Sequence, residues 1–472
     1  MKKNILDEYK HLIRVIEGIF EVLILTVAFY LIWKMCYRNT FNPAYYGRGK
    51  LVLIGIYAIG ISVIMKLSEG FKYGQLKLLD VYFAQVISVF IVNFLTYFQL
   101  SLIANKMISL LPMVMLSVIE FILCGLCCYL YTCLYHTLYV PHDMLLIYGT
   151  ESALDLKFKM ESRKDRYVIT EVISIEKEQR EIEKAIANHD AVIINEVPGV
   201  KRNDVIKYCY EHGIRTYLVP KISDIILEGA QDITLFDTPL KMVKGNGLSI
   251  PQRFIKRTMD IVLCLIALIL TSPIMLLVAL AIKLEDHGPV FYRQKRITRD
   301  GRSFSILKFR SMVVDAEKGG YDLTMRANGR DPRITKVGNI IRAIRLDEIP
   351  QIFNILKGDM SIVGPRPERV ENVEAYADEI PEWHLREKVK GGLTGYAQIY
   401  GRYNTSPIDK IKLDILYIEN YSMLLDIKLI LMTVRILFSK ESTEGFEAVE
   451  TVREKRMRLM RELERDDQTT SA

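Results

Sequence analysis

Runs of apolar residues dominate the first 140 positions of the chain. Four of them are long, at 16–35, 51–65, 81–104 and 110–140. The third continues for 24 residues without a charge, and a bilayer core requires about 20. We therefore predict a four-helix transmembrane bundle over residues 1–140. Glu17 and Glu21 interrupt the first run, and we expect them to lie at a membrane interface.

Charged residues in this region suggest how the bundle is oriented in the membrane, and one of them lies inside an apolar run. Four crossings return the chain to its starting side, and the basic N-terminus favours the cytoplasm. The loop at 34–50 is equally basic, so charge alone does not fix the orientation. Glu120 lies inside the fourth run, where a carboxylate is costly. It either has a function of its own or makes a hydrogen bond to a neighbouring helix.

Residues 141–245 change to short apolar strands that alternate with charged helical segments. Strands are expected at 144–148, 191–195 and 216–220, and helices at 175–187 and 204–212. This alternation predicts a Rossmann-like α/β domain with a parallel sheet. Only Gly149 follows the first strand, so a glycine-rich loop for a dinucleotide is missing. A spacer, dimerisation or regulatory role is favoured over cofactor binding, and a homodimer through this domain or the bundle stays open.

A second kind of membrane segment follows at 261–282, where 22 residues carry no charge. Ser272 and Pro273 lie at its middle, and proline removes a backbone donor and kinks or breaks a helix. A break half-way along favours a re-entrant helix over residues 254–284, which enters and leaves the membrane on one face. A kinked spanning helix is the alternative.

The C-terminal part has no further long apolar run. Residues 424–438 form an apolar segment with charges near one helical face, typical of a helix in the lipid interface or of a core helix. Residues 441–472 are predicted to be a charged, solvated tail.

The net charge, the distribution of basic residues and the cysteine content limit the kinds of ligand and partner that we expect. The net charge is only +7 among 472 residues, so binding of nucleic acid is not indicated. The excess is local, because residues 291–346 hold 14 Arg or Lys against 5 Asp or Glu, a surface suited to phosphates. The seven cysteines, an odd number mostly in apolar runs, do not indicate a disulfide framework. The cluster at 124–128 lacks a second ligand pair and is interpreted as apolar core.

Two adjacent acids, Asp347 and Glu348, carry the most informative chemistry. Pro350 and a short apolar helical pattern follow them, and Gly358 can end that helix. The acids therefore fall at or just before a helix N-terminus, where backbone N–H groups stabilise negative charge. Alone, Asp347 would be interpreted as an ordinary N-cap.

Basic motifs with rigid glycine and proline turns surround the acids. They include Lys308-Phe-Arg310-Ser-Met, Asp331-Pro-Arg333, Gly364-Pro-Arg366-Pro and Gly391-Gly-Leu-Thr-Gly395. Arginines on preordered turns bind a diphosphate at little ordering cost. The number and order of these motifs favour a phosphate site over a set of solvated surface charges.

With these motifs, residues 254–438 resemble the bacterial polyprenyl-phosphate sugar-1-phosphate transferases, the monotopic phosphoglycosyl transferases. Lys256-Arg257 with Asp260, Ser272-Pro273, Asp347-Glu348-Ile-Pro-Gln and Gly364-Pro-Arg-Pro carry the resemblance. The first 245 residues are similar in layout to the large members. Gly391 and Tyr396 stand where the family often has proline and tryptophan. Neither touches the acid pair, so these departures concern the substrate fit rather than the reaction class. The fold implied is a membrane protein with a helical bundle, an α/β Rossmann-like domain and a mostly α (α+β) catalytic domain at 251–440.

The resemblance implies a two-step reaction. Asp347 would attack the β-phosphate of a UDP-sugar, release UMP and hold the sugar phosphate covalently until polyprenyl (undecaprenyl) phosphate accepts it. Glu348 would help hold Mg²⁺. The remaining roles implied are phosphate contacts for Arg342, Arg366, Lys308 and Arg310, contacts with lipid headgroups for Lys256 and Arg257, and a weaker site assignment for Asp414.

The location implied is the bacterial inner membrane, multi-pass, with the catalytic domain on the cytoplasmic face of the lipid bilayer. Such an enzyme would start the synthesis of an exopolysaccharide, capsule or O-antigen type glycan. Two alternatives stay open. One is a non-catalytic scaffold for a polysaccharide assembly complex, and the other is an enzyme that moves a whole sugar and releases UDP.

Overall fold

A computed structural model of the chain divides into two compact units. Unit 1 comprises residues 1–219 and 451–472, and unit 2 comprises residues 220–450. The structure describes residues 5–461, except residues 42–47, 140, 162, 164, 236, 246, 315, 317–332, 402–404, 438–453 and 455. The contacts therefore group residues 220–245, which the sequence analysis assigns to the α/β domain, with the C-terminal unit.

Four long helices open unit 1, as the apolar runs predict. They are α1 (Ile5–Ile32), α2 (Gly49–Leu67), α3 (Leu78–Ile103) and α4 (Leu111–Leu138). Each is long and apolar enough to cross a membrane. Leucine, isoleucine and phenylalanine side chains stay exposed along their outer faces. The chain is therefore a membrane protein whose bundle presents an apolar surface to lipid.

Two buried carboxyl groups lie inside this bundle, each bonded to other helices or their loops. Tyr57 Oη and Asn93 Nδ2 donate to the carboxyl oxygens of Glu120 at 2.6 and 2.7 Å. The hydrogen-bonding interpretation of Glu120 is confirmed. Glu21 is fully buried and accepts hydrogen bonds from Tyr73 and Gln85. Glu21 is thus paired inside the bundle, with one donor from the loop between α2 and α3, and its expected place at a membrane interface stays a prediction.

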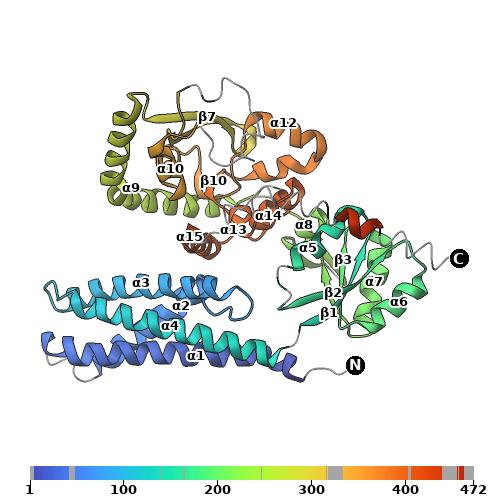
Figure 1. Cartoon of the computed structure of the whole chain (residues 1–472), viewed down its shortest axis with the longest axis horizontal. Coiled ribbons are helices and arrows are strands. Elements are labelled where there is room, and N and C mark those ends of the chain that lie inside the picture. Colours follow the sequence, from blue (N-terminus) through green and yellow to red (C-terminus); the bar gives the residue numbers. More distant parts are fainter. Residues whose placement is uncertain are drawn as a thin grey trace. The chain divides into compact units, whose positions relative to one another are not determined.

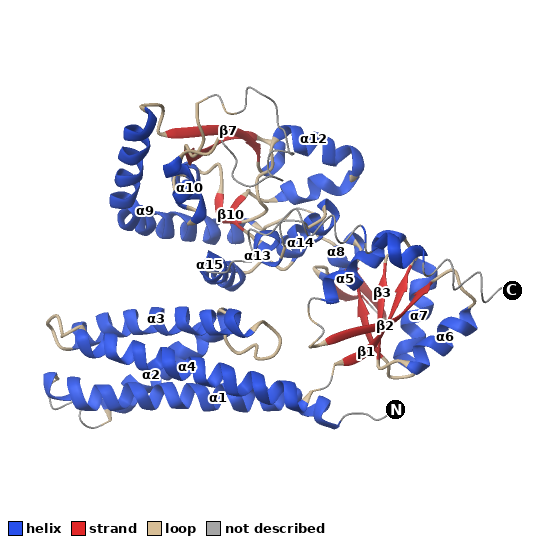
Figure 2. Ribbon diagram, in the orientation of Figure 1, coloured by secondary structure: helices blue, strands red, loops and turns tan. Residues whose placement is uncertain are grey.

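The α/β part of unit 1 is a parallel sheet in the order β2-β1-β3-β4. Its elements are β1 (His142–Tyr148), α5 (Asp155–Glu161), β2 (Tyr167–Ser174), α6 (Gln179–Asn188), β3 (Ala191–Asn195), α7 (Gly199–Glu211) and β4 (Arg215–Leu218). The parallel α/β prediction is confirmed, although β2 was not predicted. Figure 2 shows these strands in red, flanked by α6 and α7 on one side.

The other face of this sheet receives part of the C-terminal tail. Leu459 and Met460 pack against the buried cluster that includes Met144, Leu146 and Ile193. Arg456 forms an ion pair with Asp155 at 3.3 Å. The prediction of a solvated tail is therefore wrong for Leu459 and Met460, whereas Glu454, Arg458 and Arg461 are exposed.

Unit 2 begins with α8 (Ile222–Glu228) and a hairpin of β5 (Gln231–Leu235) and β6 (Thr238–Met242), followed by the long helix α9 (Ile250–Asp286). Pro273 lies inside α9 and cannot donate to the carbonyl of Ile269. Ser272 Oγ donates to that carbonyl instead, at 3.0 Å. Figure 1 shows α9 as two legs that meet at a sharp turn. The predicted bend is thus present.

The rest of unit 2 surrounds two short pairs of strands. After α9 come β7 (Phe291–Ile297), β8 (Ser303–Phe309), α10 (Lys336–Ala343), α11 (Gln351–Lys357), β9 (Ser361–Val363), α12 (Val370–Glu379), β10 (Gly392–Thr394), α13 (Tyr396–Tyr400), α14 (Pro407–Glu419) and α15 (Met423–Leu437). Strands β7 and β8 are antiparallel, whereas β9 and β10 are parallel. Figure 1 shows α10 inside the angle formed by the two legs of α9.

Candidate active site

The two acids lie on a single 3-10 turn, Leu346–Glu348, just before α11. Arg345 turns the chain into it with a left-handed backbone (φ 55°). Pro350 is the N-cap of α11, and Gly358 ends that helix with φ 100°. The predicted helix start and stop are confirmed. Strain at a residue such as Arg345 is common beside functional groups.

Glu348 is bound by two cations from different segments. Lys308 Nζ, on β8, donates to Glu348 Oε1 at 2.8 Å, and Arg366 Nη2 donates to the same oxygen at 3.0 Å. Burial would raise the pKa of Glu348, but the charges and hydrogen bonds of Arg366 and Lys308 outweigh burial and lower its pKa well below the usual range. Glu348 is therefore ionised and fixed in place.

Asp347 has the opposite environment. Among the described residues, its carboxylate forms no ion pair within 4 Å. Burial and the adjacent charge of Glu348 raise the pKa of Asp347, and the charges of Lys308 and Arg342 only partly offset them. A half-buried carboxylate with a raised pKa and no ion-pair partner among the described residues is available to react. Adjacent acids with such different surroundings can take different roles.

The three cations of the site differ in pKa, in exposure and in hydrogen bonding. Burial lowers the pKa of Lys308 more than Glu348 raises it. The Arg366 side chain is 43% exposed, and the charge of Glu348 raises its pKa. Arg342 comes from α10, and its Nη1 is buried without a hydrogen-bond partner in the described part of the chain. Lys308, Arg342 and Arg366 thus lie around the acid pair, and their contacts with phosphate stay predictions.

Two other cations that were predicted to contact phosphate or lipid form ion pairs inside the protein. Arg310 is buried and forms an ion pair with Asp286 at the end of α9. Lys256 is 5% exposed, and its Nζ bonds Asp426 Oδ2 at 2.6 Å and Tyr417 Oη at 3.0 Å. We therefore withdraw a phosphate contact for Arg310 and a headgroup contact for Lys256. In both cases a carboxylate distant in sequence neutralises the cation.

Arg257 also turns inward, although it keeps partial exposure. Its Nη1 and Nη2 donate to the carbonyls of Ile355 and Leu356 at 2.5 and 2.6 Å. These carbonyls belong to the last turn of α11, which follows the acid pair. The structure thus gives Arg257 a part in holding α11, and its predicted headgroup contact stays a prediction.

Asp414 lies behind the site rather than in it. It is 1% exposed and forms an ion pair at 2.7 Å with Arg386, whose Nη2 donates to the backbone carbonyl of Arg366 at 2.9 Å. Burial raises the pKa of Asp414 to about 6 in spite of Arg386. The sequence analysis missed Arg386, because nothing in its local sequence marks a buried arginine.

The loop that carries Arg366 is held by further backbone bonds. Gly364 N donates to Thr394 O at 2.8 Å, and Gly392 N donates to Pro365 O at 2.9 Å. A Cβ on Gly364 would strike the carbonyl of Lys390. The glycines of the predicted turns therefore allow two backbone segments to approach closely, which fixes the Arg366 loop beside the acid turn.

A divalent cation needs few protein ligands at such a site. Among the residues that the structure describes, no group of three or more His, Cys, Asp or Glu side chains is placed to hold a metal. Magnesium is usually bound by one or two carboxylates together with substrate phosphates. Asp347 and Glu348 fit that donor set, with Glu348 already ionised. The first two residues of the Asp331-Pro-Arg333 motif lie outside the described residues.

Comparison with known proteins adds a family and several relatives. A family model described as bacterial sugar transferase matches residues 251–440. The UDP-glucose:undecaprenyl-phosphate glucose-1-phosphate transferase of Escherichia coli is 43% identical over 44% of this chain and 44% of its own length. The UDP-N-acetylgalactosamine-undecaprenyl-phosphate N-acetylgalactosaminephosphotransferase of Aeromonas hydrophila is 44% identical over 48% and 53%.

A third relative is covered more fully. The UDP-glucose:undecaprenyl-phosphate glucose-1-phosphate transferase of Caulobacter vibrioides is 41% identical over 40% of this chain and 71% of its own length. The chain spans about half the length of the first two relatives. The residues that the family model matches, 251–440, contain the acid turn, β8, α10 and the Arg366 loop.

Proposed function

The chain belongs to the bacterial sugar transferase family, and on that premise we propose that it transfers a sugar-1-phosphate from a UDP-sugar to polyprenyl phosphate, with release of UMP. The observation that carries the proposal is the contrast within the acid pair. Glu348 is held by two cations, whereas Asp347 beside it has no ion pair among the described residues. This is the arrangement that a carboxylate nucleophile requires.

The first step forms a covalent intermediate on Asp347. A carboxylate oxygen attacks the β-phosphorus of the donor, and the bond from that phosphorus to the bridging oxygen breaks. The electron pair leaves with UMP. Lys308, Arg342 and Arg366 offset the charge of the diphosphate as it approaches two carboxylates. The raised pKa of Asp347 makes its ionised oxygen a stronger nucleophile than an ordinary aspartate.

The second step releases the product lipid. A phosphate oxygen of the polyprenyl phosphate attacks the phosphorus of the aspartyl phosphate, and the bond to the Asp347 oxygen breaks. The carboxylate is thereby restored, and the product is a sugar diphospholipid. Splitting one transfer into two displacements at a single phosphorus lets the same cations serve both.

Mg²⁺ would be held by Glu348 together with the donor diphosphate. When bound, it would neutralise the phosphates and stabilise the departing nucleotide. The role of Glu348 toward the protein is to keep Lys308 and Arg366 beside Asp347. We expect chelation of divalent cations to stop UMP release and Glu348→Gln to weaken its dependence on magnesium, measured by titrating the metal against initial rate.

A lipid acceptor requires the site to lie at the membrane surface. We propose that α9 is re-entrant, with both ends on the cytoplasmic face of the bacterial inner membrane. The bend at Ser272 and Pro273 and the exposed leucines of its second leg support this arrangement. Labelling of single cysteines placed before and after α9 tests it. Reaction from opposite membrane faces would contradict the re-entrant path.

The experiment that tests the reaction uses purified membranes, a panel of UDP-sugars and undecaprenyl phosphate. UMP formation that depends on the protein supports sugar-1-phosphate transfer, and the active donor identifies the sugar. Release of UDP instead would indicate transfer of the sugar alone. No nucleotide release with any donor, from protein that is correctly folded, would favour the scaffold role. We expect the product to start a glycan of the exopolysaccharide, capsule or O-antigen type.

A further inference from the structure

The first leg of α9 is bonded to two segments that lead to the site. Arg257 donates to the carbonyls at the end of α11, as described above. Asp260 Oδ1 accepts from Ile362 N at 3.0 Å, on β9, which continues into the Arg366 loop. This end of the membrane helix therefore holds the segments that carry Asp347, Glu348 and Arg366.

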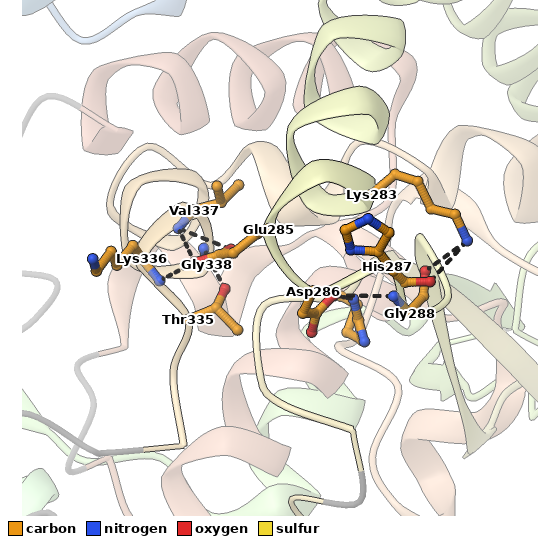
Figure 3. Close-up of polar contacts among 10 residues, drawn as sticks. Lys283, Glu285, Asp286, His287, Gly288, Thr335, Lys336, Val337 and Gly338 are labelled. Carbon is orange, nitrogen blue, oxygen red and sulfur yellow. Dashed lines mark hydrogen bonds and ion pairs between the residues drawn. The ribbon is translucent and has the colours of Figure 1, made fainter.

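The far end of α9 is bonded to the start of α10. Glu285 Oε1 accepts from the backbone N–H of Lys336 at 2.7 Å and of Val337 at 3.3 Å. Thr335 Oγ1 accepts from the next amide, Gly338, at 2.9 Å. Figure 3 shows the Glu285 carboxylate facing the first amides of α10. Two of the first backbone donors of α10 are thus satisfied by the membrane helix rather than by α10's own cap.

The neighbouring residue of α9 holds the end of β8. Asp286 forms an ion pair with Arg310, which follows Lys308 by two residues. Lys308 has a second support, because Asn354 of α11 bonds both Leu307 N and Ser305 O on β8 at 2.9 and 2.8 Å. The start of α10 has one further backbone bond, because Thr335 N, at its N-cap, donates to Ser311 O beyond the end of β8 at 3.2 Å. The first two amides of the helix that carries Arg342 are bonded by α9.

We propose that Glu285 is a positioning residue that uses the far end of the bent membrane helix to hold α10, and with it Arg342, against Asp347. This inference rests on the proposed function. The bend at Ser272 and Pro273 brings Glu285 to α10, so the path of α9 through the membrane is coupled to the charge beside the nucleophile. Glu285 touches no substrate and acts only through α10.

Four charged groups face Asp347: Glu348 on its own turn, Lys308 on β8, Arg342 on α10 and Arg366 on the loop between β9 and α12. Loss of Arg342 from this set removes a positive charge that favours the ionised carboxylate. That charge also faces the diphosphate that Asp347 attacks, so Glu285→Ala should slow the first step. We expect about a threefold to tenfold slower formation of the Asp347 adduct at a fixed pH.

Conservative and control variants separate positioning from folding. Glu285→Gln keeps an oxygen that accepts both amides, so we expect it to behave like the wild type. Glu374→Ala removes an exposed acid of α12 and should change nothing. In an Arg342→Gln background, Glu285→Ala should not slow adduct formation further, because the charge that Glu285 positions is already gone.

The experiment combines the rate of adduct formation at a fixed pH with hydrogen exchange of the peptide that covers α10. Faster exchange of this peptide in Glu285→Ala, but not in Glu285→Gln or Glu374→Ala, supports the inference. Unchanged exchange, or an undiminished effect of Glu285→Ala in the Arg342→Gln background, overturns it. If the wild-type chain forms no adduct with any donor, the proposed function is overturned. The exchange measurement does not depend on the donor, and it tests separately whether Glu285 stabilises the start of α10.

Discussion

Replacement of Glu348 by glutamine removes the one negative charge that two cations share. The side chains of Glu348 and Lys308 are 15% and 18% exposed, and their charged atoms lie 2.8 Å apart. Removing one partner from such a buried pair costs about 3–5 kcal/mol. Arg366 is 43% exposed and can return to water, so it adds little to this cost. We therefore expect Glu348→Gln to lower the free energy of unfolding by about 3 kcal/mol.

For a unit of this size, that loss corresponds to a fall in Tm of about 6–12 °C. The chain has two tryptophans, and Trp383 is the one in unit 2. In a Trp33→Phe background, the fluorescence of Trp383 in detergent therefore reports this unit. Lys308→Met added to Glu348→Gln should recover part of the loss, because the uncompensated ammonium is gone. A Tm for Glu348→Gln equal to that of the exposed control Glu374→Gln, or a further fall in the double variant, would refute the reasoning.

The same pair makes a prediction about acid stability. The folded state lowers the pKa of Glu348 below its unfolded value. The contribution of Glu348 is therefore complete above the unfolded pKa and is lost as the pH falls through the folded one. The difference in stability between wild type and Glu348→Gln should shrink in strong acid, as measured by unfolding at a series of pH values.

Three further outcomes are expected. Asp347→Asn should lower UMP release roughly a thousandfold or more while leaving thermal stability equal or higher, since burial and Glu348 already disfavour the charged form. Initial rates should fall toward acid as Asp347 becomes protonated, and this fall should begin at a pH higher than the usual aspartate pKa. They should also fall toward alkali as Lys308 loses its charge, at a pH lower than the usual lysine pKa. A chain that ends at residue 450 loses the contacts of Leu459 and Met460 with the sheet, so limited proteolysis should cut its α/β domain faster than that of the full chain. Equal cleavage would contradict this packing.

Local patterns were sufficient to predict much of the fold. The four apolar runs, the strands β1, β3 and β4, and the start of α11 after the acid pair follow from periodicity and from helix start and stop signals. Strand β2 was missed because Thr170 and Glu171 interrupt its apolar residues and only one of its eight side chains, that of Ile173, is buried. In the sequence, a half-exposed strand gives a weaker signal than a buried strand, which shows as a continuous apolar run.

The site was predicted less completely, because its charges are sorted by contacts across the chain. Lys256 and Asp426 are 170 residues apart, and Arg310 and Asp286 are 24 apart. No local pattern distinguishes these paired cations from Lys308 or Arg366, which reach the acid turn. The separate surroundings of Asp347 and Glu348 likewise depend on segments that meet only in the folded unit.

Mass spectrometry of the protein incubated with donor alone tests the central claim most directly. With a UDP-sugar and no lipid acceptor, the account predicts a gain equal to one sugar phosphate on the peptide that contains Asp347, together with one equivalent of UMP. Added polyprenyl phosphate should then remove the modification. An unmodified peptide from protein that turns over when both substrates are present would contradict the covalent route.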